Sequence, residues 1–329
     1  PACYGKGDQA TTTDADVVLG IIDPDKFLGG RMPIDPERSF AAISRIADRL
    51  DLGLYETAAG ISRIVDAKMA DLIRRMSVMR GFDPRQFCCF AFGGGGPVHA
   101  AAVAREAGVA RVIVPLPVTA ALWSAVGAAT ADVVHVLQSP QTFEEPFCVE
   151  DLLAEFQQLE ARALQQLGSE GFESDRITLT RRIRMKYAMQ VHDVEVPVDT
   201  CALAQSDADE LIDRFGEIYE NLFGAGSGFR EGGVEITGFQ VRACGETEKM
   251  EFAAMEDPRV LDSAQTERDI YWGETGQHVA TPVWEIGYGD RIPPMAGPAL
   301  VQLPDSVVVI RPAQAAEMDE LGNIIIRIL

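Results

Sequence analysis

The stretch "FCCFAFGGGGPVHAAAVAREAG", residues 87–108, places four consecutive glycines between a compact apolar run and a proline. The apolar run, 87–92, predicts a buried strand, and Pro97 predicts the first turn of a helix that ends at Gly108. The next residues, "ARVIVPLP" (110–117), predict a second buried strand. A strand, a helix and a second strand this close together are typical of a parallel sheet, so this part of the chain is expected to have an α/β fold.

The glycine run has the chemistry of an anion site. Glycine lets backbone N–H groups come close to a phosphate, and the start of a helix adds unpaired donors and the positive end of its dipole. Two nucleotide motifs are excluded. A Rossmann fingerprint fails because Val98 or His99 occupies the position of the last glycine, and the Gly-Lys-Ser/Thr of a Walker A loop is absent. A nucleotide site of the actin and sugar-kinase type remains, beside a structural alternative in which the glycines only allow close helix–sheet packing.

His99 lies just inside the predicted helix start. It could bind a phosphate or transfer a proton, because histidine titrates near neutral pH, or it could be purely structural. The other histidines are dispersed and lack the spacing of metal ligands, so no metal site is predicted from this chain's own residues.

The segment 55–80 has the strongest helical pattern in the chain. Apolar residues recur at three- and four-residue spacing and predict one buried stripe, and Lys68 falls inside it next to Ile61 and Leu72. A buried cation needs a partner or water. Lys68 is therefore predicted either to extend its charged end to solvent or to reach a bound ligand.

Taken together with the rest of the chain, these segments predict two domains. Asp35 and Pro36 predict the start of another helix, and 119–131 and 133–137 predict a helix and a strand. After 140–150 the pattern changes to two amphipathic helices separated by alternating strands, and from Gly232 onward it is almost entirely strand-like. The expected domains are 1–145, which is α/β, and 146–329, which is α+β and ends in a β-rich domain at about 232–329.

The net charge limits the classes of partner, and the cysteine content limits the cellular compartment. The 329 residues carry a net charge of −21, which argues against nucleic acid or an anionic membrane as a partner. No apolar run reaches the ~20 residues of a transmembrane helix. The six cysteines include no CxxC pair, and Cys88 and Cys89 lie in the apolar run, which predicts buried free thiols in a reducing cytoplasm.

Several ordered motifs resemble one family, that of hydantoinase A, 5-oxoprolinase and acetone or acetophenone carboxylase, in its ATP-binding subunit. They are "PACYGKG", "TTTDADVVLG", "FLGGRMPID", "AAGISRIVDAKMADLIRRMSVMRGFDPRQF", "FAFGGGGPVHA" and "SAVGAATADVVH", followed by "MKYAMQVHDVEVPV", "GGVEITGFQVRA", "TPVWE", "MAGPALVQLPDSVVVIRP" and "DELGN". The resemblance covers essentially the whole chain, which makes it much more specific than the glycine run alone.

The resemblance implies an actin-like (ASKHA-type) ATPase lobe followed by a β-rich C-terminal region. It implies that ATP with Mg²⁺ activates a substrate by phosphorylation, and that a hydantoinase B-type subunit completes a ketone carboxylation or the hydrolysis of a cyclic amide. Carried over, Gly93, Gly94, Gly95 and Gly96 line the ATP site, and Lys68 lies on the neighbouring helix.

Two departures qualify these expectations. The family's N-terminal lobe with its D-x-G-G-T phosphate loop is absent, and Pro1 replaces an initiator methionine, so the chain is expected to be part of a longer polypeptide and inactive alone. Ala188 and Met189 also stand where the family has a glycine. The motifs slightly favour ketone carboxylation over cyclic-amide hydrolysis. A non-catalytic scaffold that docks a partner subunit is the alternative of another class.

Overall fold

The computed structural model describes residues 1–115, 117–198 and 207–328, which form two compact units. The first unit comprises 1–129 together with 251–329, and the second comprises 130–250. This division differs from the expected one. The strands of the last 79 residues complete the first unit instead of forming a β-rich domain of their own, because their partners are strands and helices from the first third of the chain.

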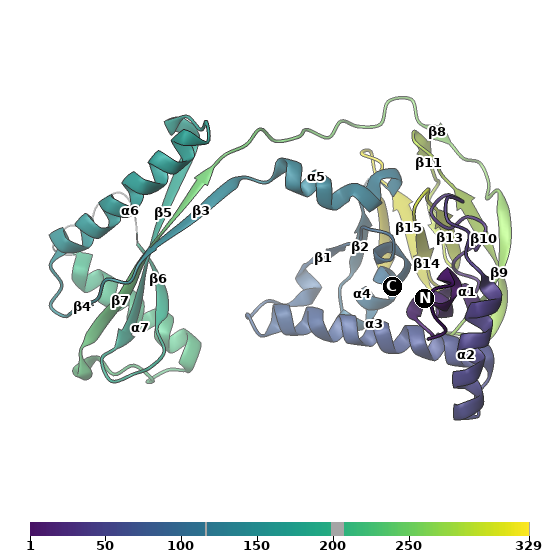
Figure 1. The fold of residues 1–329 in the computed structure, drawn as a ribbon, viewed down its shortest axis with the longest axis horizontal. Helices are drawn as coiled ribbons and strands as arrows, with labels where there is room; N and C mark the ends of the chain where they lie inside the picture. Colours follow the sequence, from purple (N-terminus) through teal and green to yellow (C-terminus); the bar gives the residue numbers. More distant parts are fainter. Residues whose placement is uncertain (116, 199–206, 329) are drawn as a thin grey trace. The chain divides into compact units, whose positions relative to one another are not determined.

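The first unit begins with four helices and two parallel strands (Figure 1). Their bounds are α1 Thr12–Val18, α2 Pro36–Leu50, α3 Leu54–Val78, β1 Cys88–Phe90, α4 Gly96–Ala107 and β2 Arg111–Val114, with 3₁₀ turns at Ala2–Tyr4 and Pro84–Gln86. A 3₁₀ turn at Pro117–Leu122 and α5, Trp123–Thr130, follow. The C-terminal part adds β8 Arg259–Val260, β9 Thr266–Trp272, β10 Gln277–Glu285, β11 Asp290–Arg291, β12 Met295–Ala296, β13 Ala299–Gln302, β14 Val307–Ile310, β15 Gln314–Met318 and β16 Ile324–Ile328.

The predicted strand–helix–strand unit is confirmed. β1 and β2 pair in parallel, with Cys88 opposite Arg111, and α4 connects them. Its helix ends where the sequence predicts, because Gly108 takes the left-handed conformation (φ 82°) that closes the last turn. The prediction that β1 is buried is wrong. Cys88 and Phe90 are exposed and Cys89 is half-buried, since β1 is the edge strand of its sheet.

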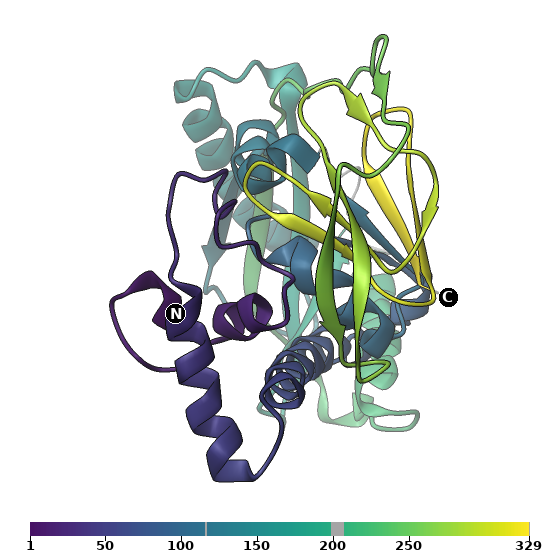
Figure 2. The same cartoon turned by 90° about the vertical axis from the view of Figure 1, so that its right-hand side faces the viewer.

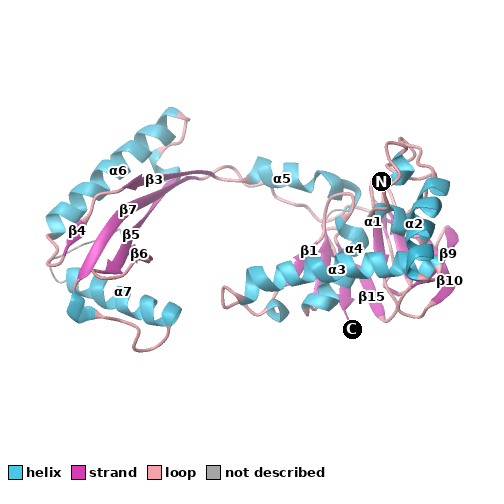
Figure 3. Ribbon diagram, turned by 60° about the horizontal axis from the view of Figure 1, so that its bottom comes forward, coloured by secondary structure: helices cyan, strands magenta, loops and turns pink. Residues whose placement is uncertain are grey.

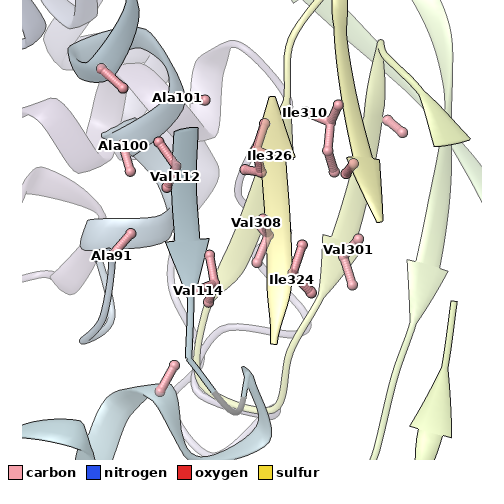
Figure 4. Close-up of a cluster of buried hydrophobic side chains, with 14 of the residues drawn as sticks. Ala91, Ala100, Ala101, Val112, Val114, Val301, Val308, Ile310, Ile324 and Ile326 are labelled. Carbon is pink, nitrogen blue, oxygen red and sulfur yellow. The ribbon is translucent and has the colours of Figure 1, made fainter. Parts of the chain in front are cut away.

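Two sheets organise this unit. One has the order β1-β2-β16-β15-β12 and the other β14-β13-β10-β9. The second sheet is covered on both faces. One face packs Val301, Val308 and Ile310 into a core shared with α4 and the first sheet (Figure 4), and the other packs against α1, α2 and α3 (Figure 2). Double coverage explains why every residue of β13 and β14 is buried.

The second unit is a sheet with two helices on one face (Figure 3). Its elements are β3 Val133–Ser139, β4 Phe143–Glu144, α6 Val149–Ser169, β5 Ile177–Tyr187, β6 Val194–Val198, α7 Asp207–Phe223 and β7 Val234–Gly245, with 3₁₀ turns at Ser174–Arg176 and Arg230–Gly232. The strand order is β3-β7-β5-β6, with β4 also paired to β7. Large side chains such as Phe156 and Phe215 fill the space between sheet and helices. The sequence predicted both helices and the alternating strands of this region.

The described cysteines, Cys3, Cys88, Cys89, Cys148 and Cys244, are free thiols, and Cys201 lies outside the described residues. In the part of the chain that the structure describes, no helix has the length and apolarity needed to cross a membrane.

Asp14 ties the start of the chain to α1 and α2. The fully buried carboxylate accepts hydrogen bonds from the backbone N–H groups of Ala2, Cys3 and Thr11 and from the hydroxyls of Thr11 and Ser39. Burial alone would raise the pKa of Asp14, but these hydrogen bonds outweigh it and hold the pKa well below its usual value.

We expect Asp14→Asn to destabilise the first unit by about 2–4 kcal/mol at neutral pH. The side-chain NH₂ group of asparagine would face the N–H and O–H donors that the carboxylate now accepts from. The stabilisation by Asp14 is present above the unfolded-state pKa of about 3.9 and is lost as pH falls towards the lower folded-state pKa, so the difference from wild type should shrink below about pH 4. Urea unfolding followed by tryptophan fluorescence measures it, since Trp123, Trp272 and Trp284 all lie in this unit. The exposed Asp48→Asn is the control, and an equal effect of both changes would contradict the prediction.

Candidate functional site

The glycine run forms an anchored loop between β1 and α4. Gly93 has a φ of 80°, a conformation that favours glycine, and its N–H donates to the carbonyl of Ala120 at 2.9 Å. The carbonyl of Gly94 accepts a hydrogen bond of 2.7 Å from the Ser306 hydroxyl, which belongs to the connection between β13 and β14. The loop is therefore held on both sides, by residues distant in sequence.

The start of α4 is open. Gly95 is the N-cap residue, and none of the side chains that the structure describes caps the helix. A Cβ atom built on Gly93 or Gly95 would meet no heavy atom within 4 Å, and one on Gly94 or Gly96 would meet only ordinary contacts at 3.8 Å. Internal packing thus does not require this run of glycines, which argues against the packing alternative. Pro97 has no N–H and the Val98 N–H donates to the Gly95 carbonyl at 3.2 Å, so the N–H groups of Gly94, Gly95 and Gly96, together with the helix dipole, are the donors that suit an anion.

His99, in the first turn of α4, links this helix to α3 and α1 through side-chain contacts. Its Nδ1 lies 2.9 Å from the Asp66 carboxylate of α3, and its Nε2 lies 3.3 Å from the Asp16 carboxylate of α1. Both carboxylates are buried, and the Ser62 hydroxyl donates to Asp16 at 3.2 Å. Figure 1 shows these helices in the first unit, where α1 and α4 each contact α3.

Two opposing effects act on the pKa of His99. Burial lowers it, but the hydrogen bonds to Asp16 and Asp66 and their negative charges outweigh burial and raise the pKa to about 10. The imidazole is then protonated at neutral pH, with both ring nitrogens engaged. The predicted catalytic role of His99 stays a prediction. These contacts favour a positioning role, because an imidazolium held by two carboxylates has no lone pair to accept a proton.

Further charged side chains follow Asp66 in a row beside α4. The Arg311 guanidinium, which follows β14, lies 3.8 Å from Asp66 and 3.0 Å from Glu274, and Arg105 of α4 lies 3.6 Å from Glu274. The signs alternate from Asp16 through to Arg105. The row is buried from Asp16 to Arg311 and reaches solvent at Arg105; its buried charges are stabilised only while each keeps its neighbours, so the row fixes α4 against α1, α3 and the end of β14.

A cavity of about 490 Å³ lies beside this row, between α3, the second half of α4 and the turn from β9 to β10. Small residues such as Ala59, Gly60 and Gly273 leave the space, and Asp66, Arg105 and Arg311 contribute charges of both signs to its lining. The glycine loop is not among the lining residues. The cavity and the loop are thus separate features linked by α4.

The buried stripe predicted on α3 is confirmed only in part, since Ile61, Met69 and Ile73 are half-buried and pack against the cores. Ala58, Ser62, Asp66 and Ala70 form its buried face at four-residue spacing, whereas Ile64 and Leu72 are more than half exposed. Lys68 is exposed as well, two positions from Asp66 and hence on the opposite side of the helix. The structure therefore brings His99 and the glycine loop together on α4 and leaves Lys68 apart from them. A nucleotide contact by Lys68 stays a prediction.

Sequence reasoning missed Asp16, Asp66, Glu274 and Arg311. One signal was available, because Ala58, Ser62, Asp66 and Ala70 repeat every four residues with small or polar side chains. Such a repeat marks a helix face in close contact with a polar neighbour. In the described residues, no group of three or more histidine, cysteine or acidic side chains is placed to hold a metal ion.

Comparison with known proteins assigns the chain to a family. The sequence profile described as Hydantoinase/oxoprolinase matches residues 1–136, and that of the Hydantoinase/oxoprolinase C-terminal domain matches 144–326. The chain belongs to the hydantoinase/oxoprolinase family. The boundary between the two profiles, unlike the boundary between the compact units, falls near the predicted one at 145 and 146.

Individual members of the hydantoinase/oxoprolinase family support the assignment. The acetophenone carboxylase gamma subunit of Aromatoleum aromaticum is 31% identical over 98% of this chain and 45% of its own length. The caprolactamase of Pseudomonas jessenii, described as ATP-dependent, has a similar structure, with a TM-score of 0.84, 25% identity and coverage of 99% of this chain and 48% of that one. A nucleotide-free acetone carboxylase, from work on ATP-dependent acetone carboxylation, gives a TM-score of 0.76, 27% identity and coverage of 100% and 48%.

The chain spans about half the length of these relatives. The structural similarity establishes a mixed α/β fold shared with acetone carboxylase and caprolactamase.

Proposed function

We propose that the chain is the C-terminal part of an ATP-binding subunit of the hydantoinase/oxoprolinase family and that Gly93–Gly96 bind the phosphates of ATP. The open start of α4 carries this proposal, because among the described residues no side-chain cap competes for the N–H groups of Gly94, Gly95 and Gly96. The anchoring of the loop by Ser306 and Ala120 supports it further, since a fixed loop does not lose freedom when it binds.

ATP bound at this loop would supply the phosphoryl group that activates the substrate. The backbone of the loop would hold and orient the phosphates, and His99 would fix the position of α4 behind them. Mg²⁺ would need ligands from elsewhere in the full-length protein, because the described residues form no acidic group suited to it. In this proposal, the subunit's N-terminal lobe supplies those ligands and completes an actin-like ATPase, and residues 1–329 alone are inactive.

Ketone carboxylation is the reaction we favour. Its support is the similarity to the acetophenone carboxylase subunit and to acetone carboxylase. Hydrolysis of a cyclic amide is the second candidate, favoured by the higher TM-score of the ATP-dependent caprolactamase. In both reactions a hydantoinase B-type subunit would act on the phosphorylated intermediate, in the cytoplasm. A non-catalytic docking scaffold is disfavoured, because a scaffold has no need of an open, anchored glycine loop.

Substrate-stimulated ATP turnover of the full-length subunit with its partner subunit tests the reaction. We expect acetone or acetophenone, given with bicarbonate, to stimulate ADP release, with stimulation lost when bicarbonate is omitted. Caprolactam, hydantoin and 5-oxoproline are the comparison substrates. Stimulation by one of these instead would establish the amidase alternative, and no stimulation by any compound would contradict both.

A further inference from the structure

The first strand of the first unit has a free edge. Among the described residues, β1 pairs on one side only, with β2, and ends the order β1-β2-β16-β15-β12 (Figure 1). The N–H of Ala91 donates to the Ile113 carbonyl of β2 at 2.8 Å. Because successive residues of a strand direct their backbone groups to opposite sides, those of Phe90 are directed to the free edge.

The side chains at this edge are apolar. Phe87 and Phe90 are 51% and 50% exposed, and the ring of Phe82 packs on that of Phe87 with centroids 6.0 Å apart. No charged residue occurs in 87–92. Natural sheet edges are usually protected by charges, prolines or bulges against pairing with other chains. Residues 87–92 contain no charge and no proline, and the short length of β1, three residues, is the one protection of this edge that the described residues provide.

The adjoining part of α3 extends the apolar surface. Leu72, Met76 and Met79 follow one another at four- and three-residue spacing, so they share one face of the helix. All are more than half exposed, Met79 to 81%. We name these three residues together with Phe82, Phe87 and Phe90 the open edge; Phe87 and Phe90 are three positions apart in extended backbone and therefore flank β1 on opposite faces. An exposed apolar surface of this kind is typical of a site of association.

We propose that a strand from the part of the full-length subunit outside residues 1–329 pairs with β1 and covers the open edge. The relatives supply the reason for this occupant, because this chain matches only 45% to 48% of their length and the remainder belongs to the same polypeptide. Strand addition pairs the backbone groups that β1 directs away from β2, and apolar side chains of the added segment remove the phenylalanines and methionines from water. The inference rests on the proposal that the chain is part of a longer ATP-binding subunit.

Amide hydrogen exchange tests the pairing. We expect the Phe90 amide to exchange at least ~100-fold more slowly in the full-length subunit than in a protein of residues 1–329, while the Ala91 amide is protected in both. Equal, fast exchange of Phe90 in the two proteins would overturn the proposal. The measurement needs no ATP. Lost ATP binding with a protected β1 would therefore count against the proposed function alone, and intact turnover with an unprotected β1 against this inference alone.

A pair of variants identifies the occupant. Phe90→Asp in the full-length subunit should expose the open edge and increase protease cleavage between residues 1–329 and the rest of the subunit. Leu50→Asp, at a somewhat more exposed apolar residue at the end of α2, should not. If the full-length protein instead dimerises, and Phe90→Asp converts it to a monomer without increasing cleavage, a second copy covers the open edge and the proposal is wrong.

Discussion

Gly95→Asp in the full-length subunit is expected to abolish substrate-stimulated ATP turnover, lowering it at least ~100-fold. The carboxylate would occupy the open space at the start of α4 where the phosphates are proposed to lie. It would also satisfy the helix N–H groups itself, as an ordinary cap does, and repel the anion. ADP release measures turnover, and binding of a labelled ATP analogue separates lost binding from lost chemistry.

The structure provides controls that keep this result interpretable. Gly95 has a φ of −99° and a ψ of −19°, which any residue adopts, so neither Gly95→Asp nor Gly95→Ala should prevent folding. Gly95→Ala adds a methyl group without charge and should retain much of the activity. Gly7→Asp introduces the same charge at an exposed glycine with open space around it and should have no effect. Wild-type turnover by the Gly95→Asp variant would show that the loop does not bind the nucleotide.

Local signals in the sequence were sufficient to predict the features that depend on residues close together in the chain. Asp35 caps α2 and Pro36 occupies its first turn as predicted, and Gly108 ends α4. The parallel pairing of β1 with β2 followed from a connection long enough for one helix and too long for a hairpin. These features depend on residues within about 20 positions of one another, which a sequence displays directly.

Distant pairings were not predictable in the same way. β16 pairs antiparallel with β2, so Ile326 lies opposite Val112, more than 200 positions earlier. Nothing in the apolar run "NIIIRIL" specifies that partner, because any strand with a buried face offers the same pattern. The compact units differ from the predicted domains for this reason. The strands were expected, but the sheet that they complete was not.

The row of buried charges was missed because sequence patterns treat acidic residues as exposed. On α3 the apolar spacing placed Leu72 inside and did not identify Asp66 as a buried residue. Tertiary contacts decide which of these side chains are buried. Asp66 is buried because His99 and Arg311 surround it, and Leu72 is exposed because nothing in the described residues covers that part of the helix.

His99→Leu is expected to destabilise the first unit by about 3–5 kcal/mol, because it leaves Asp16 and Asp66 buried without their shared cation. Urea unfolding followed by tryptophan fluorescence reports on this unit alone. His278→Leu is the matched control. His278 also lies near a carboxylate, that of Asp269 at 3.1 Å, but both side chains are substantially exposed and the change should cost little.

The pH dependence distinguishes this charge effect from lost packing. The stabilisation by protonated His99 is complete below its unfolded-state pKa of about 6.5 and is lost as pH rises through its folded-state pKa of about 10. Between these values the folded state binds one proton more than the unfolded state, so the free energy of unfolding should fall by up to ~1.4 kcal/mol per pH unit. His99→Leu should lack this slope, and His278→Leu should keep it. A variant that is destabilised but retains the slope would show that His99 acts through its volume, and the positioning role inferred from its two carboxylates would then be wrong.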